Sequence, residues 1–221
     1  MRVLTTALLL LASAAAAPAA LLTYNGHDNS RGEDIYLQVN GRENTVFAGV
    51  VEITIDNIFN SDALCVEFFK TISEGDFATN ITTPDAINEG GRIAWLVENY
   101  LSTVNSTAIG AGLQLAVWDL VHDSGDGFAS GQIRSAVNYT TPADVLAYAN
   151  DFLLWSQNQS SSNALVYFNN NIGNGNMRQT LIGPGPTPGE DQVPEPATVF
   201  LTGAALLAFG ALNQRRKKVS Q

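Results

Sequence analysis

The chain has 221 residues and a formal net charge of −10. Residues 21–193 hold 20 of the 21 acidic and 6 of the 11 basic residues, so this part alone has a net charge of −14. A surface with this charge repels nucleic acid and anionic lipid headgroups, which excludes both as expected partners. Once the two ends are set aside as targeting signals, the remaining length is that of one ordinary domain.

The first 20 residues have the pattern of a secretory signal peptide. Arg2 supplies the positive charge, residues 3–11 form an apolar run, and the segment ASAAAAPAA offers small residues for cleavage. We therefore expect an exported protein. Its single cysteine, Cys65, cannot form an internal disulfide, so we expect this residue to be buried or chemically used.

Residues 21–83 combine β-branched and aromatic runs with Gly and Asn turns, which is typical of β-structure. We expect strands at 35–39 and 46–55, joined by a tight turn at Asn40-Gly41. A further strand is expected at 63–69, and alternation along it would place Cys65 on the same face as Ala63. The Gly- and Asn-rich stretch around His27 predicts a loop.

From residue 84 the apolar residues recur at helical spacing. Helices are expected at 92–101, at 107–123 with a cap at Ser106 or Thr107, and from a cap at Thr141 to near Trp155. Strands return at 164–168 and 178–182. The pattern predicts an α+β domain over residues 21–183: an antiparallel β-sandwich or barrel with an inserted helical subdomain at about 84–156.

The C-terminal part begins with a Pro- and Gly-rich linker at 184–192. Residues 193–218 then combine the sequence Val-Pro-Glu-Pro, a 16-residue apolar run at 197–212, and a basic cluster at 215–218. The apolar run is short for a membrane crossing, which needs about 20 residues, and the basic cluster favours a cytoplasmic C-terminus.

This ending resembles the PEP-CTERM sorting signal of Gram-negative bacteria, whose three parts occur in the same order. The resemblance implies recognition by an exosortase and cleavage near the motif. It also implies at least transient membrane contact through the C-terminal segment. The mature protein would then reside at the cell surface or in an extracellular biofilm matrix.

One polar residue, Gln114, stands in the middle of the almost wholly apolar segment 107–123. Burying a primary amide costs a few kcal/mol unless both its oxygen and its nitrogen find partners. Gln114 should therefore be well hydrogen-bonded or chemically changed. A thiolate held against it could displace ammonia and form an internal thioester, which an external amine can attack to give a stable amide.

At these residues the sequence resembles the thioester domains of bacterial surface adhesins, over about residues 46–123. The matching segments are Leu64-Cys65-Val66 and Leu113-Gln114-Leu115-Ala116-Val117-Trp118, with Leu64 and Leu113 where that family often has tyrosine and threonine. The resemblance implies that Cys65 and Gln114 are the bond partners and that Trp118 supports them. It also implies an adhesin-like protein that attaches covalently to an amine-bearing surface protein or polysaccharide. Such a protein captures without turnover, so no enzyme activity, catalytic residue or cofactor is expected.

Two other functions remain open. The first is a non-reactive structural or glycan-binding protein of the extracellular matrix, in which Cys65 stays a thiol and Tyr24, Tyr36 or Tyr139 stacks on sugars. The second is a secreted hydrolase that pairs Cys65 with His27 or His122.

The segment HDSGDG, at residues 122–127, resembles part of a calcium loop. It lacks a closing bidentate acid at the usual spacing, so we expect a solvated turn and no metal.

Overall fold

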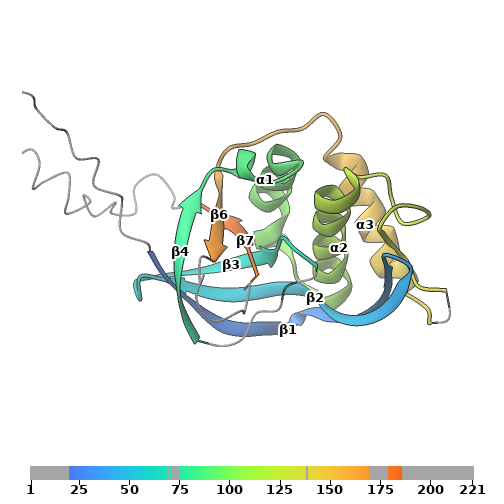
Figure 1. The fold of residues 1–221 in the computed structure, drawn as a ribbon, viewed down its shortest axis with the longest axis horizontal. Coiled ribbons are helices and arrows are strands. Elements are labelled where there is room, and N and C mark those ends of the chain that lie inside the picture. The colour runs from blue at the N-terminus through green and yellow to red at the C-terminus, as the bar shows by residue number, and fades with distance from the viewer. Residues whose placement is uncertain (1–19, 69, 71–74, 138, 170–178, 186–221) are drawn as a thin grey trace, which may run out of the picture. The chain divides into compact units, whose positions relative to one another are not determined.

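Two long antiparallel strands form the hairpin on which the fold is built (Figure 1). Strand β1 spans Ala20–Val39 and strand β2 spans Arg42–Ile55. Asn40 and Gly41 connect them, with φ angles of 49° and 78°. A two-residue hairpin turn of this kind needs positive φ at both positions, which Asn and Gly adopt at low cost, so the predicted turn is confirmed.

Strand β1 is much longer than the sequence predicted, because it continues through the Gly- and Asn-rich stretch at 25–34. The pairing with β2 shifts register between Tyr24 and Gly26 and again between His27 and Gly32. The prediction that His27 lies in a loop is therefore wrong. Cross-strand pairing overrides the local turn propensity here, and the two irregularities accommodate the extra residues.

Six antiparallel strands close into a barrel, and a seventh joins its rim. The ring runs β1, β2, β3, β7, β6, β4 and back to β1, while β5 pairs with the C-terminal end of β1. Strands β3 to β7 span Phe59–Cys65, Gly75–Thr82, Ile133–Ser135, Ala164–Asn169 and Leu181–Pro184. The expected antiparallel α+β fold is confirmed. Strands β4 and β5 were not predicted, and β3 ends at Cys65 rather than at residue 69.

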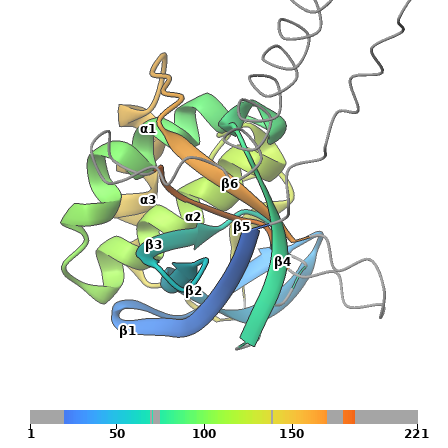
Figure 2. The same cartoon turned by 90° about the vertical axis from the view of Figure 1, so that its left-hand side faces the viewer.

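Three helices lie together on one side of the barrel strands (Figures 1 and 2). They are α1 at Gly90–Tyr100, α2 at Thr107–Asp123 and α3 at Ala143–Trp155, with short 3₁₀ turns at Pro84–Ala86 and Leu101–Thr103. Helix α2 begins and ends at the predicted residues. Its cap is Ser106, whose side chain accepts a hydrogen bond from the main-chain N–H of Ile109.

The predicted cap of α3 is wrong, because the N-cap residue is Pro142 and makes no side-chain hydrogen bond. Thr141 is instead turned toward the strands. Its hydroxyl donates to the main-chain oxygen of Tyr36 at 2.5 Å and accepts from the N–H of Ala136 at 3.1 Å. A tertiary contact that joins β1 to the loop before α3 has replaced the local one.

Neighbouring strand residues alternate between two apolar cores, as the two-residue period of a strand requires. One core fills the barrel: Leu22, Tyr24, Val51, Ile53, Ile55, Ala63, Phe77, Tyr167 and Leu181. The larger one lies between the strands and the helices and includes Leu64, Val66 and most of α2. Cys65 packs against both cores. Cys65 therefore lies where the barrel meets the helices.

Gly110 lets helix α2 lie directly against the backbone of β1. A Cβ atom at this position would lie 1.9 Å from the main-chain oxygen of Arg31. We expect Gly110→Ala to lower the free energy of unfolding by at least about 1–3 kcal/mol, because backbone cannot move aside as a side chain can. Urea denaturation measures this loss.

The matched control for that substitution is Gly91→Ala in helix α1. Its Cβ would lie 2.4 Å from Ser160 Oγ, which can rotate away, and 3.4 Å or more from the other two atoms of Ser160 that it approaches. Alanine also has the higher helix propensity, so this variant should be neutral or more stable. Equal losses in the two variants would show that close packing at Gly110 is not the cause.

The structure describes residues 20–68, 70, 75–137, 139–169 and 179–185. All of them belong to one unit, Ala19–Pro186. The predicted signal peptide up to residue 19, the linker from residue 186 and the C-terminal sorting signal lie outside the described residues. Within the described part of the chain, no helix is both long and apolar enough to span a membrane.

Candidate functional site

Cys65 and Gln114, which are 49 residues apart in sequence, are joined by two hydrogen bonds. The main-chain N–H of Cys65 donates to Gln114 Oε1, and Gln114 Nε2 donates to the main-chain oxygen of Cys65, each at 2.8 Å. Gln114 is only 1% exposed. The structure thus brings the two predicted bond partners into contact, and it gives both polar atoms of the buried amide a hydrogen-bond partner.

The end of strand β3 explains why a side-chain amide fits here. Val66 N–H donates to the main-chain oxygen of Thr180, on the β7 side of the strand. Because successive residues direct their main-chain groups to opposite edges, those of Cys65 point the other way. On that edge the pairing with β2 has already ended, at Ala63 opposite Val51. The carboxamide of Gln114 takes the place of the missing strand.

Three residues spaced four apart on α2 face this strand end: Gln114, Trp118 and His122. Trp118 is 2% exposed, and its ring packs edge-on against Phe68 with the centroids 5.0 Å apart. His122 Nε2 accepts a hydrogen bond from the main-chain N–H of Phe68 at 3.4 Å. Helix α2 therefore holds the segment from Cys65 to Phe68 at three successive turns.

Glu67 fixes the same segment from the β7 side. Its carboxylate accepts hydrogen bonds from the main-chain N–H and the hydroxyl of Thr180, at 2.6 and 2.8 Å. It also forms an ion pair with Lys70 at 2.6 Å, while Gln179 Nε2 donates to the main-chain oxygen of Glu67. Sequence reasoning did not find this set, because Glu67 is 112 and 113 residues away in sequence from Gln179 and Thr180.

The thiol of Cys65 is strongly disfavoured as a free thiolate. Burial raises its pKa to about 12, and the negative charge of Glu67 contributes in the same direction. A cysteine in this state is inert as a simple nucleophile toward external substrates. The high pKa of the Cys65 thiol therefore argues against a cysteine hydrolase and is compatible with a protein that uses Cys65 only once.

The two histidines are placed poorly for a cysteine hydrolase. His27 stacks on Phe47, with the ring centroids 4.1 Å apart. It pairs with Val51, which pairs in turn with Ala63 of β3, so it lies two strand spacings from that strand. His122 is nearer, but its Nε2 already accepts the Phe68 N–H. Burial lowers the pKa of both imidazoles.

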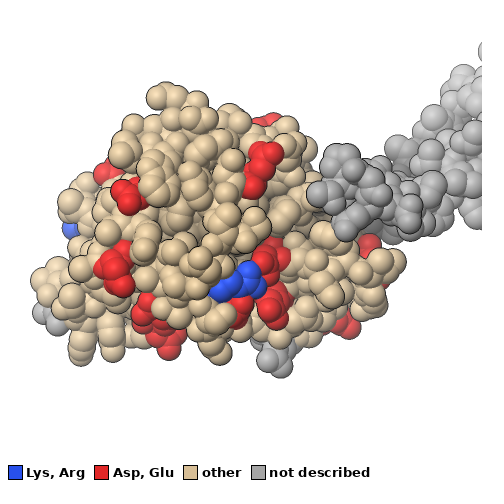
Figure 3. Space-filling view, turned by 180° about the vertical axis from the view of Figure 1, so that it is seen from behind, with Lys and Arg blue, Asp and Glu red and all other residues tan. Residues whose placement is uncertain are grey.

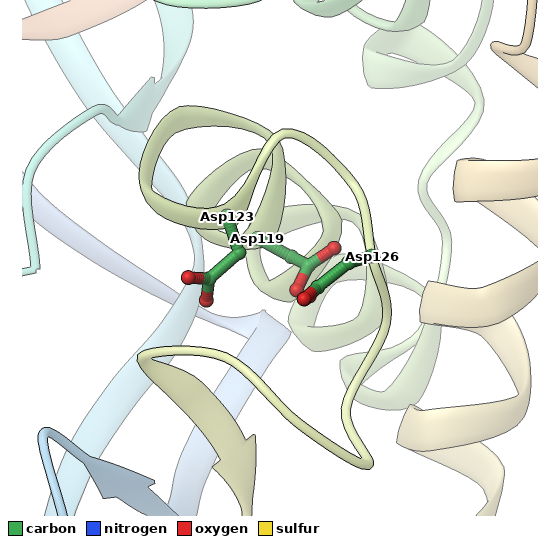
Figure 4. A group of neighbouring side chains, drawn as sticks. All are labelled: Asp119, Asp123 and Asp126. Atoms are coloured by element: carbon green, nitrogen blue, oxygen red, sulfur yellow. The ribbon is translucent and has the colours of Figure 1, made fainter.

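A second group of polar side chains lies at the C-terminal end of α2 (Figure 4). It consists of Asp119, Asp123 and Asp126, which could together hold a metal ion. Burial raises the pKa of Asp119 to about 6, and the other two carboxylates add to the shift. The sequence analysis singled out the loop with Asp123 and Asp126 but missed Asp119, although it is the one acid inside the apolar part of the helix.

Of the residues predicted to act together, the structure places Cys65, Gln114 and Trp118 at one site. The tyrosines considered for sugar stacking differ in burial. Tyr24 is 4% exposed, whereas Tyr36 and Tyr139 are 37% and 56% exposed. Tyr36 and Tyr139 stack on each other, with the ring centroids 4.7 Å apart.

Comparison of the chain with protein-family models, with curated proteins and with solved structures found no match.

Proposed function

We propose that this protein attaches covalently to amine-bearing targets through an internal thioester between Cys65 and Gln114. The observation that carries the proposal is the pair of 2.8 Å hydrogen bonds that hold the Gln114 carboxamide against Cys65. Groups held close together behave as if at very high concentration. The two hydrogen bonds run to the main chain of Cys65, so they place the carboxamide beside the residue whose thiol is to react with it.

The hydrogen bonds also suit the chemistry of bond formation. Cys65 Sγ attacks Gln114 Cδ, the C–N bond breaks and a C–S bond forms. The thiol proton leaves with the nitrogen as ammonia. The Cys65 N–H already donates to Gln114 Oε1, where negative charge develops in the tetrahedral intermediate, and such a preset donor stabilises that charge.

Capture of a target reverses the roles of the two residues. The nitrogen of an external amine attacks the thioester carbon, a C–N bond forms and the C–S bond breaks. The proton lost by the amine passes to the sulfur, so the products are an amide on Gln114 and a free Cys65 thiol. The high pKa of this thiol disfavours its return to the thiolate. Capture therefore ends in a stable amide and happens once per molecule.

Lysine placement fits a protein that carries its own acyl electrophile. Lys70 is the only lysine within residues 21–193. Its ammonium group is in an ion pair with Glu67. The one lysine of this range is therefore held by an acidic partner, which suits a protein with a proposed acyl electrophile.

The proposed setting is the cell surface or extracellular matrix of a Gram-negative bacterium, reached by export and exosortase sorting through the C-terminal signal. Acidic side chains are spread over the face shown in Figure 3, where basic ones are few. Such a surface supports a protein or polysaccharide target carrying amines, and not a nucleic acid. The proposed protein is not an enzyme and uses no cofactor in this capture.

Intact mass spectrometry of the purified protein under non-reducing, neutral conditions tests the proposal. The expected mass is one ammonia below that of the sequence, and it should rise by one methylamine after incubation with that amine. A full sequence mass, unchanged by methylamine, would contradict the thioester and leave both residues with structural roles only.

A second candidate function is reversible glycan binding by a non-reactive matrix protein. The observation that favours it is the exposed, stacked pair of Tyr36 and Tyr139, because aromatic rings offer flat apolar faces to sugars. We expect Tyr139→Ala to weaken binding of soluble matrix polysaccharide at least tenfold in calorimetry, since it removes one ring of the pair. Trp155→Ala, which removes an exposed aromatic ring on α3, serves as the control. Equal effects of the two variants would argue against a sugar site at the tyrosines.

A further inference from the structure

Three carboxylates lie near one another at the C-terminal end of α2; in Figure 4 those of Asp119 and Asp126 are adjacent and that of Asp123 lies to one side. One oxygen each of Asp119, Asp123 and Asp126 lies within 4.8 Å of the other two. Asp119 and Asp123 are one helical turn apart on the same face. Asp126 comes from the loop that follows, where Ser124 and Gly125 turn the chain back with φ angles of 59° and 82°.

Asp119 is the observation that points to a missing ligand. Its side chain is fully buried, and its Oδ2 accepts a hydrogen bond from the Gly127 N–H at 3.1 Å. Its Oδ1 is buried and has no hydrogen-bond partner among the described residues. Buried polar atoms are nearly always satisfied, so an orphaned carboxylate oxygen beside two further carboxylates marks a place for a cation.

The other two carboxylates are oriented by their surroundings. Asp123 accepts hydrogen bonds from the main-chain N–H groups of Gln132 and Ile133, at 2.7–2.9 Å. Asp126 Oδ2 accepts a long one from Ser130 Oγ, at 3.4 Å. Each carboxylate oxygen has more than one acceptor direction, so these contacts fix the groups and leave capacity for a cation.

The protein's own cation near this loop, Arg92, is already engaged elsewhere. Its guanidinium donates to the main-chain oxygens of Ser124 and Leu153, at 3.3 and 3.1 Å, and to Ser156 Oγ at 3.3 Å. It also pairs with Glu89 at 3.4 Å. Arg92 forms no hydrogen bond or ion pair with the three aspartates among the described residues, so the group keeps an excess of negative charge.

We propose that Asp119, Asp123 and Asp126 form a Ca²⁺ site. Calcium takes six to eight oxygen ligands at about 2.3–2.6 Å in a flexible geometry. Three oxygens that all lie within 4.8 Å of one another can reach one such ion. Magnesium demands near-ideal octahedral geometry and keeps several of its waters, so it usually takes only one or two carboxylates. Water and main-chain carbonyls complete the coordination.

The site would fix the end of the helix that carries Gln114 and Trp118, but it does not depend on the thioester. A Cys65→Ala variant, which cannot form the thioester but keeps the hydrogen bonds to Gln114, should bind Ca²⁺ as the unmodified protein does. Failure of covalent capture and failure of ion binding are therefore separate results.

Calorimetric titration of the EDTA-treated, dialysed full chain with CaCl₂ tests the proposal. We expect one Ca²⁺ per chain, with a Kd in the range of about 10⁻⁴–10⁻³ M that is typical of extracellular modules. MgCl₂ should bind at least tenfold more weakly. Asp126→Asn should weaken Ca²⁺ binding at least tenfold and, since Asp126 is exposed, leave the fold intact. Asp119→Asn should do the same wherever its circular dichroism spectrum matches that of the unmodified protein.

Asp144→Asn is the matched control, because Asp144 is an exposed acid on α3 outside the group. It should leave the Kd unchanged. The proposal is overturned if no saturable binding occurs up to about 10 mM Ca²⁺, an order of magnitude above the expected range. It is also overturned if Mg²⁺ binds as tightly as Ca²⁺, or if Asp144→Asn weakens binding as much as Asp126→Asn.

Discussion

Replacing Cys65 with alanine is expected to abolish methylamine incorporation and to restore the full sequence mass. Without the sulfur no thioester can form, so Gln114 keeps its amide and offers no electrophile. The substitution preserves the main-chain N–H and C=O groups that hold Gln114, so the fold should remain. Intact mass before and after methylamine measures both effects in one experiment.

Two further variants show whether the loss is specific. Gln114→Glu replaces the amide by a carboxylate, which a thiol does not displace, so it should also show full mass and no capture. Lys70→Arg removes the only lysine of residues 21–193 and keeps a positive charge opposite Glu67, so capture should persist. Incorporation that survives in Cys65→Ala would place the reactive group elsewhere in the chain.

The same Cys65→Ala protein separates covalent capture from glycan binding. The stacked pair of Tyr36 and Tyr139 lies on β1 and in the loop before α3, and Cys65 is not part of that contact. Reversible polysaccharide binding, if present, should therefore be unchanged in the variant. A parallel loss of both properties would mean that the substitution disturbs the fold as a whole.

The sequence predicted those elements whose signals lie within the segment itself, and it missed those that depend on pairing with distant residues. Helix α2 was predicted at both ends because its apolar run, its Ser106 cap and the following Ser-Gly turn are all encoded within the segment. The Asn40-Gly41 turn is local in the same sense. Strand β5 has only three residues and depends on pairing with the end of β1, so no local sequence pattern predicts it.

In the candidate site, the residues could be predicted from the sequence, whereas their contacts could not. Cys65, Gln114 and Trp118 could be named from the sequence, but the manner of contact could not, because it follows from where β2 stops pairing with β3. Thr141 has the composition of a helix cap and serves instead as a link to β1. Asp119 was missed because its partner Asp126 reaches it only through the loop after α2.

Removing the Gln114 amide is expected to cost much of the stability of the domain even where no thioester can form. The test uses Cys65→Ala as background, in which the amide stays unreacted. Adding Gln114→Met keeps an unbranched side chain of similar size and removes both hydrogen bonds. Two main-chain groups of the strand end then lack partners, and each costs about 1–3 kcal/mol. We expect the double variant to unfold with about 2–4 kcal/mol less free energy than the Cys65→Ala protein.

Urea denaturation followed by circular dichroism measures this difference. The control is Gln157→Met in the same background, because Gln157 is exposed after α3 and its replacement should change stability by less than about 0.5 kcal/mol. A similarly small loss at Gln114 would mean that the end of β3 finds other partners and that the amide is not needed as a substitute strand.

The two experiments together decide what Gln114 is for. A large loss of stability without amine capture in the unmodified protein would assign it to the strand end alone. A large loss together with capture would mean that one amide serves twice: it closes the edge of β3 while the chain folds, and that closure holds its carbonyl carbon beside Cys65. In that case the same two hydrogen bonds that make the buried amide stable also make its reaction with Cys65 possible.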